Sequence, residues 1–139
     1  MLEQLMQSVE SGLKDLSRRL LQPSPREQLL EDLYQVNAQL RVRREELTKA
    51  QQELAGIKRR LRDNPTRAAL LHSRVETMLK NRRMDQAWCT SLDLDQLRQT
   101  MARDQETCPR VEQRCWSLHF LIRQLERRLE RLHEQLERA

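Results

Sequence analysis

The chain has 139 residues, of which 34% are charged and only 3% aromatic, and it contains two glycines and four prolines. A compact β-sandwich or α/β domain is excluded, because such folds need glycine turns, β-branched runs and aromatic bulk. The formal net charge of +5 comes mostly from arginine (22 Arg and 4 Lys), but 21 acidic residues are interspersed with the basic ones, which is typical of solvated helix faces.

The first predicted helix covers residues 2–21. Its apolar residues alternate spacings of four and three, which is the heptad pattern of a coiled coil. The stripe consists of Leu2, Met6, Val9, Leu13, Leu16 and Leu20. Gln22 and Pro23 then predict the end of the helix. Residues 1–22 are therefore expected to form an N-terminal amphipathic helix, distinct from residues 24–139.

The second predicted helix covers residues 25–62. Ser24 suits the N-cap, Pro25 the first helical position, and Glu27 can complete a capping box. Leucine then returns at every seventh position, at Leu33, Leu40, Leu47, Leu54 and Leu61. Arg43 stands in the same stripe where an apolar residue is expected. A charge there can fix register and partner, or its stem can stay apolar while the guanidinium reaches solvent.

Breaks in the pattern predict where the remaining helices lie. Asn64 and Pro65 suggest a short turn, so that a helix over 66–107 folds back along 25–62 as a hairpin. Residues 81–92 interrupt the stripe, and we expect a local break there, with Thr90 or Asp93 as a fresh N-cap. Pro109 predicts either a kink or the start of a new helix, because an interior proline removes a hydrogen bond.

The last predicted helix covers residues 109–138 and carries the most regular stripe. The stripe includes Leu118, Ile122, Leu125, Leu129, Leu132 and Leu136. Trp116 and Phe120 stand one turn apart on another face, which a two-stranded seam does not need. The same ridge continues as Arg123, Arg127 and Arg131. The aromatic residues indicate either a bundle of three or more helices, which we favour, or a docking face for a partner. The arginines would suit an acidic partner, the alternative for them being a solvated face.

The fold class that follows is all-α. We expect an elongated antiparallel helical bundle or coiled coil of three long helices plus the short N-terminal helix. Disorder is the alternative for so hydrophilic a chain, and the regular stripes argue against it. The leucine stripes at 33–61 and 118–136 are the candidate interfaces.

Catalytic and metal chemistry have little support in the sequence. Cys115 and His119 are four residues apart, but a zinc site needs three or four ligands, and the other cysteines and histidines have no characteristic spacing. No glycine-rich phosphate loop or nucleophile elbow occurs. We therefore expect no catalytic residue, no cofactor and no metal, and a protein that is not an enzyme.

A non-catalytic scaffold or adaptor fits these features best. We expect a subunit of a larger helical assembly of cytoskeletal, centrosomal, kinetochore or trafficking type, with other coiled-coil proteins or a second copy as partner. The alternative is a basic helical protein that binds nucleic acid, and an acidic protein surface would suit the same charges. A basic-leucine-zipper is excluded, because the residues before the zipper contain two prolines and no continuous basic helix.

The location is expected to be intracellular. Three cysteines without short spacing do not make a disulfide framework. The first ten residues lack the basic start and apolar core of a signal peptide. The longest apolar run, at 118–122, is far short of a membrane span. We expect a cytoplasmic protein, in keeping with a cytoskeletal role, and leave the nucleus open.

Overall fold

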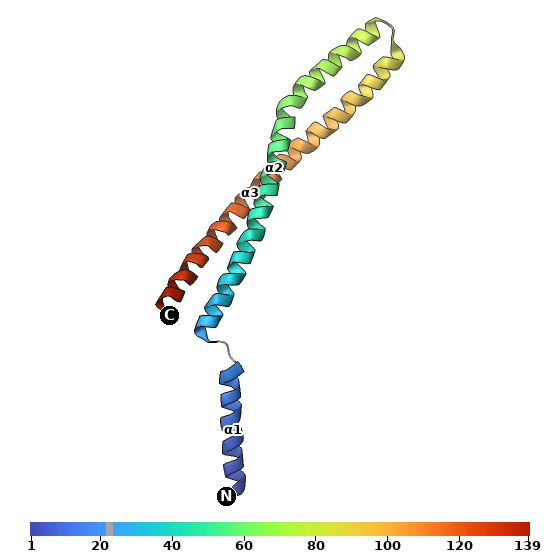
Figure 1. Ribbon diagram of the computed structural model, residues 1–139. Helices are drawn as coiled ribbons and strands as arrows, with labels where there is room; N and C mark the ends of the chain where they lie inside the picture. The colour runs from blue at the N-terminus through green and yellow to red at the C-terminus, as the bar shows by residue number, and fades with distance from the viewer. Residues whose placement is uncertain (22–23) are drawn as a thin grey trace. The chain divides into compact units, whose positions relative to one another are not determined.

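The computed structural model describes residues 1–21 and 24–139, apart from the side chains at 15, 17–19 and 21. These residues form three helices, α1 (Leu2–Leu21), α2 (Pro25–Lys80) and α3 (Met84–Arg138), and no strand (Figure 1). The predicted all-α class is confirmed, but three helices stand where four were predicted. Gln22 and Pro23, the predicted end of the first helix, lie outside the described residues.

The start of α2 follows the capping chemistry of its sequence. The amide of Glu27 donates to Oγ of Ser24 over 3.2 Å, and the amide of Ser24 donates to Oε2 of Glu27 over 3.4 Å. Two donors that a helix N-terminus leaves without an intrahelical partner are thereby satisfied. The predicted capping box at Ser24 is confirmed.

The predicted turn at Asn64 and Pro65 is wrong, because α2 continues through both residues to Lys80. Asn64 is buried in the stripe, and the stripe keeps its phase on either side of it. An interior proline costs about 3 kcal/mol, but ending the helix would unpack several stripe residues worth about 1.5 to 3 kcal/mol each. Packing therefore outweighs the local breaking signal.

The same reasoning applies to Pro109, which lies inside α3. The predicted division into helices over 66–107 and 109–138 is therefore wrong. Seam positions on both sides of the proline, at Asp104 and Val111, are buried in one uninterrupted heptad phase. Pro109 itself is exposed, so its ring displaces no core side chain.

The hairpin turn lies at residues 81–83, within the stretch where a break was expected. The amide of Arg83 donates to the carbonyl of Met78 over 2.9 Å, and the amide of Arg82 donates to that of Leu79 over 3.1 Å. These bonds make a Schellman motif, with Arg82 at φ 57° in the left-handed position that usually holds glycine. The predicted N-cap at Thr90 or Asp93 is wrong, because α3 begins at Met84.

Contacts divide the chain into two compact units, one of residues 42–123 and the other of residues 1–41 with 124–139. In the unit of 42–123, α2 and α3 run antiparallel on either side of the turn (Figure 1). Its core is a cluster of small and aliphatic seam residues: Ala50, Ile57, Val111, Cys115 and Leu118, flanked by Leu47, Leu54, Leu61 and Cys108.

The other unit contains the start of α2, the end of α3, and α1. Val36 and Leu40 of α2 are buried, as are Leu125 and Leu132 of α3. The stripe residues of α1 are all exposed, so this burial comes from the two long helices. The heptad stripes of α2 and α3 are thus covered within a single chain.

Candidate interaction surfaces

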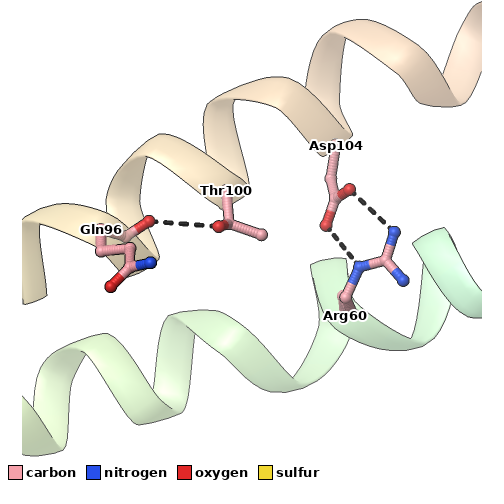
Figure 2. Close-up of polar contacts among 4 residues, drawn as sticks. All are labelled: Arg60, Gln96, Thr100 and Asp104. Atoms are coloured by element: carbon pink, nitrogen blue, oxygen red, sulfur yellow. Dashed lines mark hydrogen bonds and ion pairs between the residues drawn. The ribbon is translucent and has the colours of Figure 1, made fainter. Parts of the chain in front are cut away.

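An ion pair between a buried carboxylate and a half-exposed guanidinium interrupts the apolar seam of the unit formed by residues 42–123. Asp104 occupies a seam position of α3 and is only 6% exposed. Nε of Arg60 donates to Oδ2 of Asp104 over 2.9 Å, and Nη2 donates to Oδ1 over 3.0 Å (Figure 2). The two-pronged geometry matches guanidinium to carboxylate and fixes their mutual orientation.

In this pair, each side chain stabilises the charged form of the other. Hydrogen bonds from Arg60 lower the pKa of the Asp104 carboxyl below its ordinary value, and burial only partly opposes them. The same hydrogen bonds raise the pKa of the Arg60 guanidinium. The side chain of Arg60 is 47% exposed, so its charge keeps contact with water while Asp104 lies in the seam.

Asn64 lies one turn from Arg60 on α2 and is also buried in the seam. Asn64 and Asp104 are the two buried polar residues in the part of the chain that the structure describes. Thr100, one turn before Asp104, turns its hydroxyl back to the carbonyl of Gln96 over 3.1 Å, so it stays bonded within α3 (Figure 2). A polar layer in a coiled-coil seam costs stability but favours one register over its neighbours.

Sequence reasoning missed this pair because it depends on the position of the turn. A turn at 64–65 would have placed Asp104 near the beginning of α2 rather than opposite Arg60. The observed turn sets a register in which Lys58 pairs with Glu112 over 3.3 Å and Gln51 contacts His119 over 3.5 Å. The sequence signal that could have indicated this ion pair was the acidic residue Asp104 at a seam position.

Arg43, the candidate for setting register, has a local partner. Its Nη1 donates to Oε2 of Glu46 on the same helix over 3.1 Å, and the side chain is 42% exposed. This is the arrangement of an apolar stem with a charged end near solvent. The cross-helix ion pair that the structure does show at a seam position belongs to Arg60 and Asp104.

The leucine stripes proposed as interfaces lie in the seam between α2 and α3. The buried members are Leu40, Leu118, Ile122, Leu125 and Leu132, and the half-buried ones are Leu33, Leu47, Leu54, Leu61, Leu129 and Leu136. The hairpin therefore covers most of the apolar surface that had suggested an external partner.

The ridge on the other face of α3 is open. Trp116 and Phe120 are among the most exposed large apolar residues of the unit formed by 42–123, and Arg123 beside them is also exposed. Arg127 and Arg131, which belong to the other unit, are likewise exposed. Trp88 and Leu92 are exposed on α3 as well, and the sequence reading had overlooked them.

The apolar stripe of α1 is the largest uncovered seam. Its six stripe residues are 58–79% exposed, and Leu5 adjoins them. Glu3 and Glu10 each follow a stripe residue directly, so acidic side chains flank the seam at a seven-residue interval. A heptad stripe of this kind is stabilised when another helix covers it.

A metal site requires several ligand side chains close together. No group of three or more potential metal ligands occurs among the described residues. Cys89 is exposed, Cys108 half-buried and Cys115 buried, and all three are free thiols. In the part of the chain that the structure describes, no helix is both long and apolar enough to span a membrane.

Comparison with protein-family models, with curated proteins and with solved structures finds no match to this chain.

Proposed function

We propose that this protein is a non-catalytic helical scaffold or adaptor that enters a larger helical assembly through α1. The proposal rests on the difference in exposure between the stripe of α1 and the stripes of α2 and α3. The stripes of α2 and α3 are covered by each other, whereas the six stripe residues of α1 are exposed. An exposed heptad seam next to a completed hairpin is a surface for another helix.

Charge indicates what the partner helix looks like. Glu3 and Glu10 flank the first half of the α1 seam, and Lys14, Arg18 and Arg19 follow in its second half. Flanking charges in coiled coils select partners of opposite sign. We therefore expect a partner helix with a heptad stripe and with basic flanking residues opposite Glu3 and Glu10, in an assembly of cytoskeletal, centrosomal, kinetochore or trafficking type.

The nucleic-acid alternative is weakened because several basic residues, within 41–44 and 58–62, are paired with carboxylates. In the cluster at 58–62, Lys58 pairs with Glu112, Arg60 with Asp104, and Arg62 with Asp63. Cations already paired with carboxylates gain less from phosphate, because the existing partner has to be displaced. The cluster at 41–44 includes Arg43, which pairs with Glu46.

Two variants with the same added charge test the role of α1. Met6→Asp with Leu13→Asp places two carboxylates in the seam, and Gln4→Asp with Ser11→Asp places two at the same interval on the opposite face. Tagged chains are used to recover partners from nuclease-treated lysate at about 300 mM salt, where exposed charge pairs are screened and apolar seams persist.

Stoichiometric recovery of a helical protein by the wild type and the opposite-face variant, lost in the seam variant, is the expected result. Equal recovery by all three chains would remove α1 from the interface. A partner that disappears with nuclease or at the higher salt would favour the nucleic-acid alternative.

A further inference from the structure

The turn at 81–83 closes one end of the hairpin that α2 and α3 form (Figure 1). We call this end, residues 73–92, the tip; it belongs to the unit of residues 42–123. The two helices still contact each other here, because the hydroxyl of Thr90 donates to Sδ of Met78 over 3.5 Å. Large apolar side chains of the tip are nevertheless 48–67% exposed, namely Leu79, Met84, Trp88 and Leu92.

Three of these apolar side chains follow one another along α3. Met84, Trp88 and Leu92 are spaced by four residues, so they lie on successive turns of one side of the helix. At about 1.5 Å per residue, Trp88 is about 6 Å and Leu92 about 12 Å along the axis from Met84. The next positions along that side are the polar residues Asp95 and Gln99. The exposed apolar surface is therefore confined to the tip and is too short for a second long helix to wind along it.

The basic side chains of the tip have no carboxylate partner. Within residues 73–92 the basic residues are Arg74, Lys80, Arg82 and Arg83, and the acidic ones are Glu76 and Asp85. None of these basic side chains forms an ion pair in the described structure, whereas three basic residues within 58–62 do. The tip therefore carries a net positive charge that is available to an external anion.

Two of these arginines line an open hollow beside the turn. Its lining consists of Ser73, Arg74, Thr77, Met78, Asn81 and Arg83. Guanidinium groups donate forked hydrogen bonds to phosphate oxygens, and the hydroxyl of Ser73 and the amide of Asn81 are further donors. The hydroxyl of Thr77 is already used, since it donates to the carbonyl of Ser73 over 3.0 Å. The donors that remain suit a phosphate group.

We infer that the tip docks on a membrane surface that contains anionic lipids. Arg74 and Arg83 bind lipid phosphates, and Leu79 and Met84 enter the boundary between headgroups and acyl chains. Trp88, one helical turn from Met84, then lies at the depth of the headgroups, where the partly polar ring of tryptophan is favoured. The negative potential of an anionic leaflet attracts the basic side chains to this position.

A membrane surface suits the tip better than nucleic acid does. Phosphates of either kind would attract the basic side chains, but the backbone of a duplex has no apolar layer that could cover Leu79 and Met84. An anionic membrane offers the phosphates and the apolar layer together. The inference goes beyond the proposed role of α1 and does not depend on it, because α1 contributes no residue to the tip.

The two tryptophans of the chain report which part of α3 meets the membrane. Trp116 is also exposed, but it lies about 42 Å from Trp88 along the helix, outside the tip. Vesicles of phosphatidylcholine with about 30% phosphatidylserine are added to full-length Trp116→Phe and Trp88→Phe. Emission from Trp88 in the first chain should move to shorter wavelength, and emission from Trp116 in the second should not.

Equal shifts from the two tryptophans would show a chain that lies flat on the membrane, and an absence of any shift would show no contact. Either result would overturn the inference. Met6→Asp with Leu13→Asp, added to Trp116→Phe, should leave the shift of Trp88 unchanged. Loss of that shift would place the membrane contact at α1 instead of the tip.

Charge removal tests the contact with lipid phosphates. Arg74→Gln with Arg83→Gln should weaken partition onto the anionic vesicles about 30-fold in a flotation assay, since each arginine near such a surface contributes about fivefold. Arg59→Gln with Arg103→Gln removes the same charge from exposed residues outside the tip and should leave partition nearly unchanged. An equal loss in both variants would mean that net charge alone drives binding, which would overturn the inference.

Apolar substitution separates a membrane from nucleic acid. Leu79→Gln with Met84→Gln keeps every charge and should weaken partition onto the vesicles roughly tenfold. Val42→Gln with Leu70→Gln changes two exposed apolar residues outside the tip and should have no such effect. A DNA duplex that displaces the vesicles, and binds Leu79→Gln with Met84→Gln as well as the wild type, would assign the tip to nucleic acid and overturn the inference.

Discussion

At Asp104 a carboxylate takes a seam position that a heptad normally gives to an apolar side chain. An isolated carboxylate in the seam is costly, so the pairing of Asp104 with the half-exposed Arg60 is expected to favour the register that brings them together. A shift by one heptad would leave the Asp104 carboxylate in the seam without Arg60, so this pair favours the observed antiparallel register.

The titration of Asp104 gives a prediction with a definite sign. Its pKa is lowered in the folded chain, so the pair stabilises the fold above the ordinary aspartate value of about 3.9. That stabilisation is lost as the pH falls through the lower, folded value. We expect Asp104→Asn to lower the melting temperature at pH 7 and to match the wild type at strongly acidic pH.

Melting curves of both chains from neutral to strongly acidic pH check this sign. Asp95→Asn is the control, because Asp95 is an exposed carboxylate of the same helix that bonds only to Gln99 in its own turn. A constant difference between wild type and Asp104→Asn at every pH would contradict the linkage.

Arg82 holds a backbone conformation that suits glycine better. It is the non-glycine residue with positive φ in the described chain, at 57° in the turn between α2 and α3. The left-handed region costs a residue with Cβ about 1 to 2 kcal/mol, of which glycine's extra freedom in the unfolded chain returns part. Arg82→Gly should therefore raise the free energy of unfolding by about 0.5 to 1 kcal/mol.

Urea denaturation of Arg82→Gly and Asn81→Gly measures this effect. Asn81 is adjacent in the same turn but has a negative φ, so glycine there should destabilise the chain. If both substitutions changed stability in the same direction, the strain at Arg82 would not be the cause.

At the scale of elements, α2 and α3 each tolerate an interior proline. Pro65 and Pro109 are exposed, and each removes one amide donor from its helix. The helices continue because the seam on the opposite face keeps its phase and its burial. Local sequence signals for a break therefore lose to packing summed over many turns.

The cost of such a proline can be measured. Pro65→Ala should raise the free energy of unfolding by up to about 3 kcal/mol, since a backbone hydrogen bond is regained and a ring clash is removed. Urea denaturation compares it with Pro25→Ala, which changes the first residue of α2, where no intrahelical donor is lost. A gain of equal size at Pro25 would show that composition alone, rather than position, sets the effect.

At the scale of the molecule, the chain divides into two units that share two helices. The leucines predicted as an external interface lie in the seam between α2 and α3, and the large apolar side chains left exposed include the α1 stripe and two separate pairs on α3, Trp88 with Leu92 and Trp116 with Phe120.

The two units should respond separately to disruption. Leu125→Asp with Leu132→Asp buries two unpaired carboxylates in the seam of the unit that contains the chain ends, at several kcal/mol each. Hydrogen exchange should then show lost protection over 25–41 and 124–138, with protection kept over 42–123.

Gln124→Asp with Arg131→Asp is the matched control, since both residues are exposed and the interval is the same seven residues. This control should retain protection throughout. Loss of protection across 42–123 in the seam variant would mean that the two units unfold as one cooperative body.

The sequence by itself determined the helical class, the heptad stripes and the capping box at Ser24, because each of these depends on residues within a few turns of one another. Only the tertiary structure decided the number of helices, the turn at 81–83, and the pairing of Arg60 with Asp104. The turn contains neither glycine nor proline, whereas Asn64 and Pro65 offered a stronger local signal. Seam packing between distant segments overrules such local signals, and the register that decides which charges meet exists only once both helices are in place.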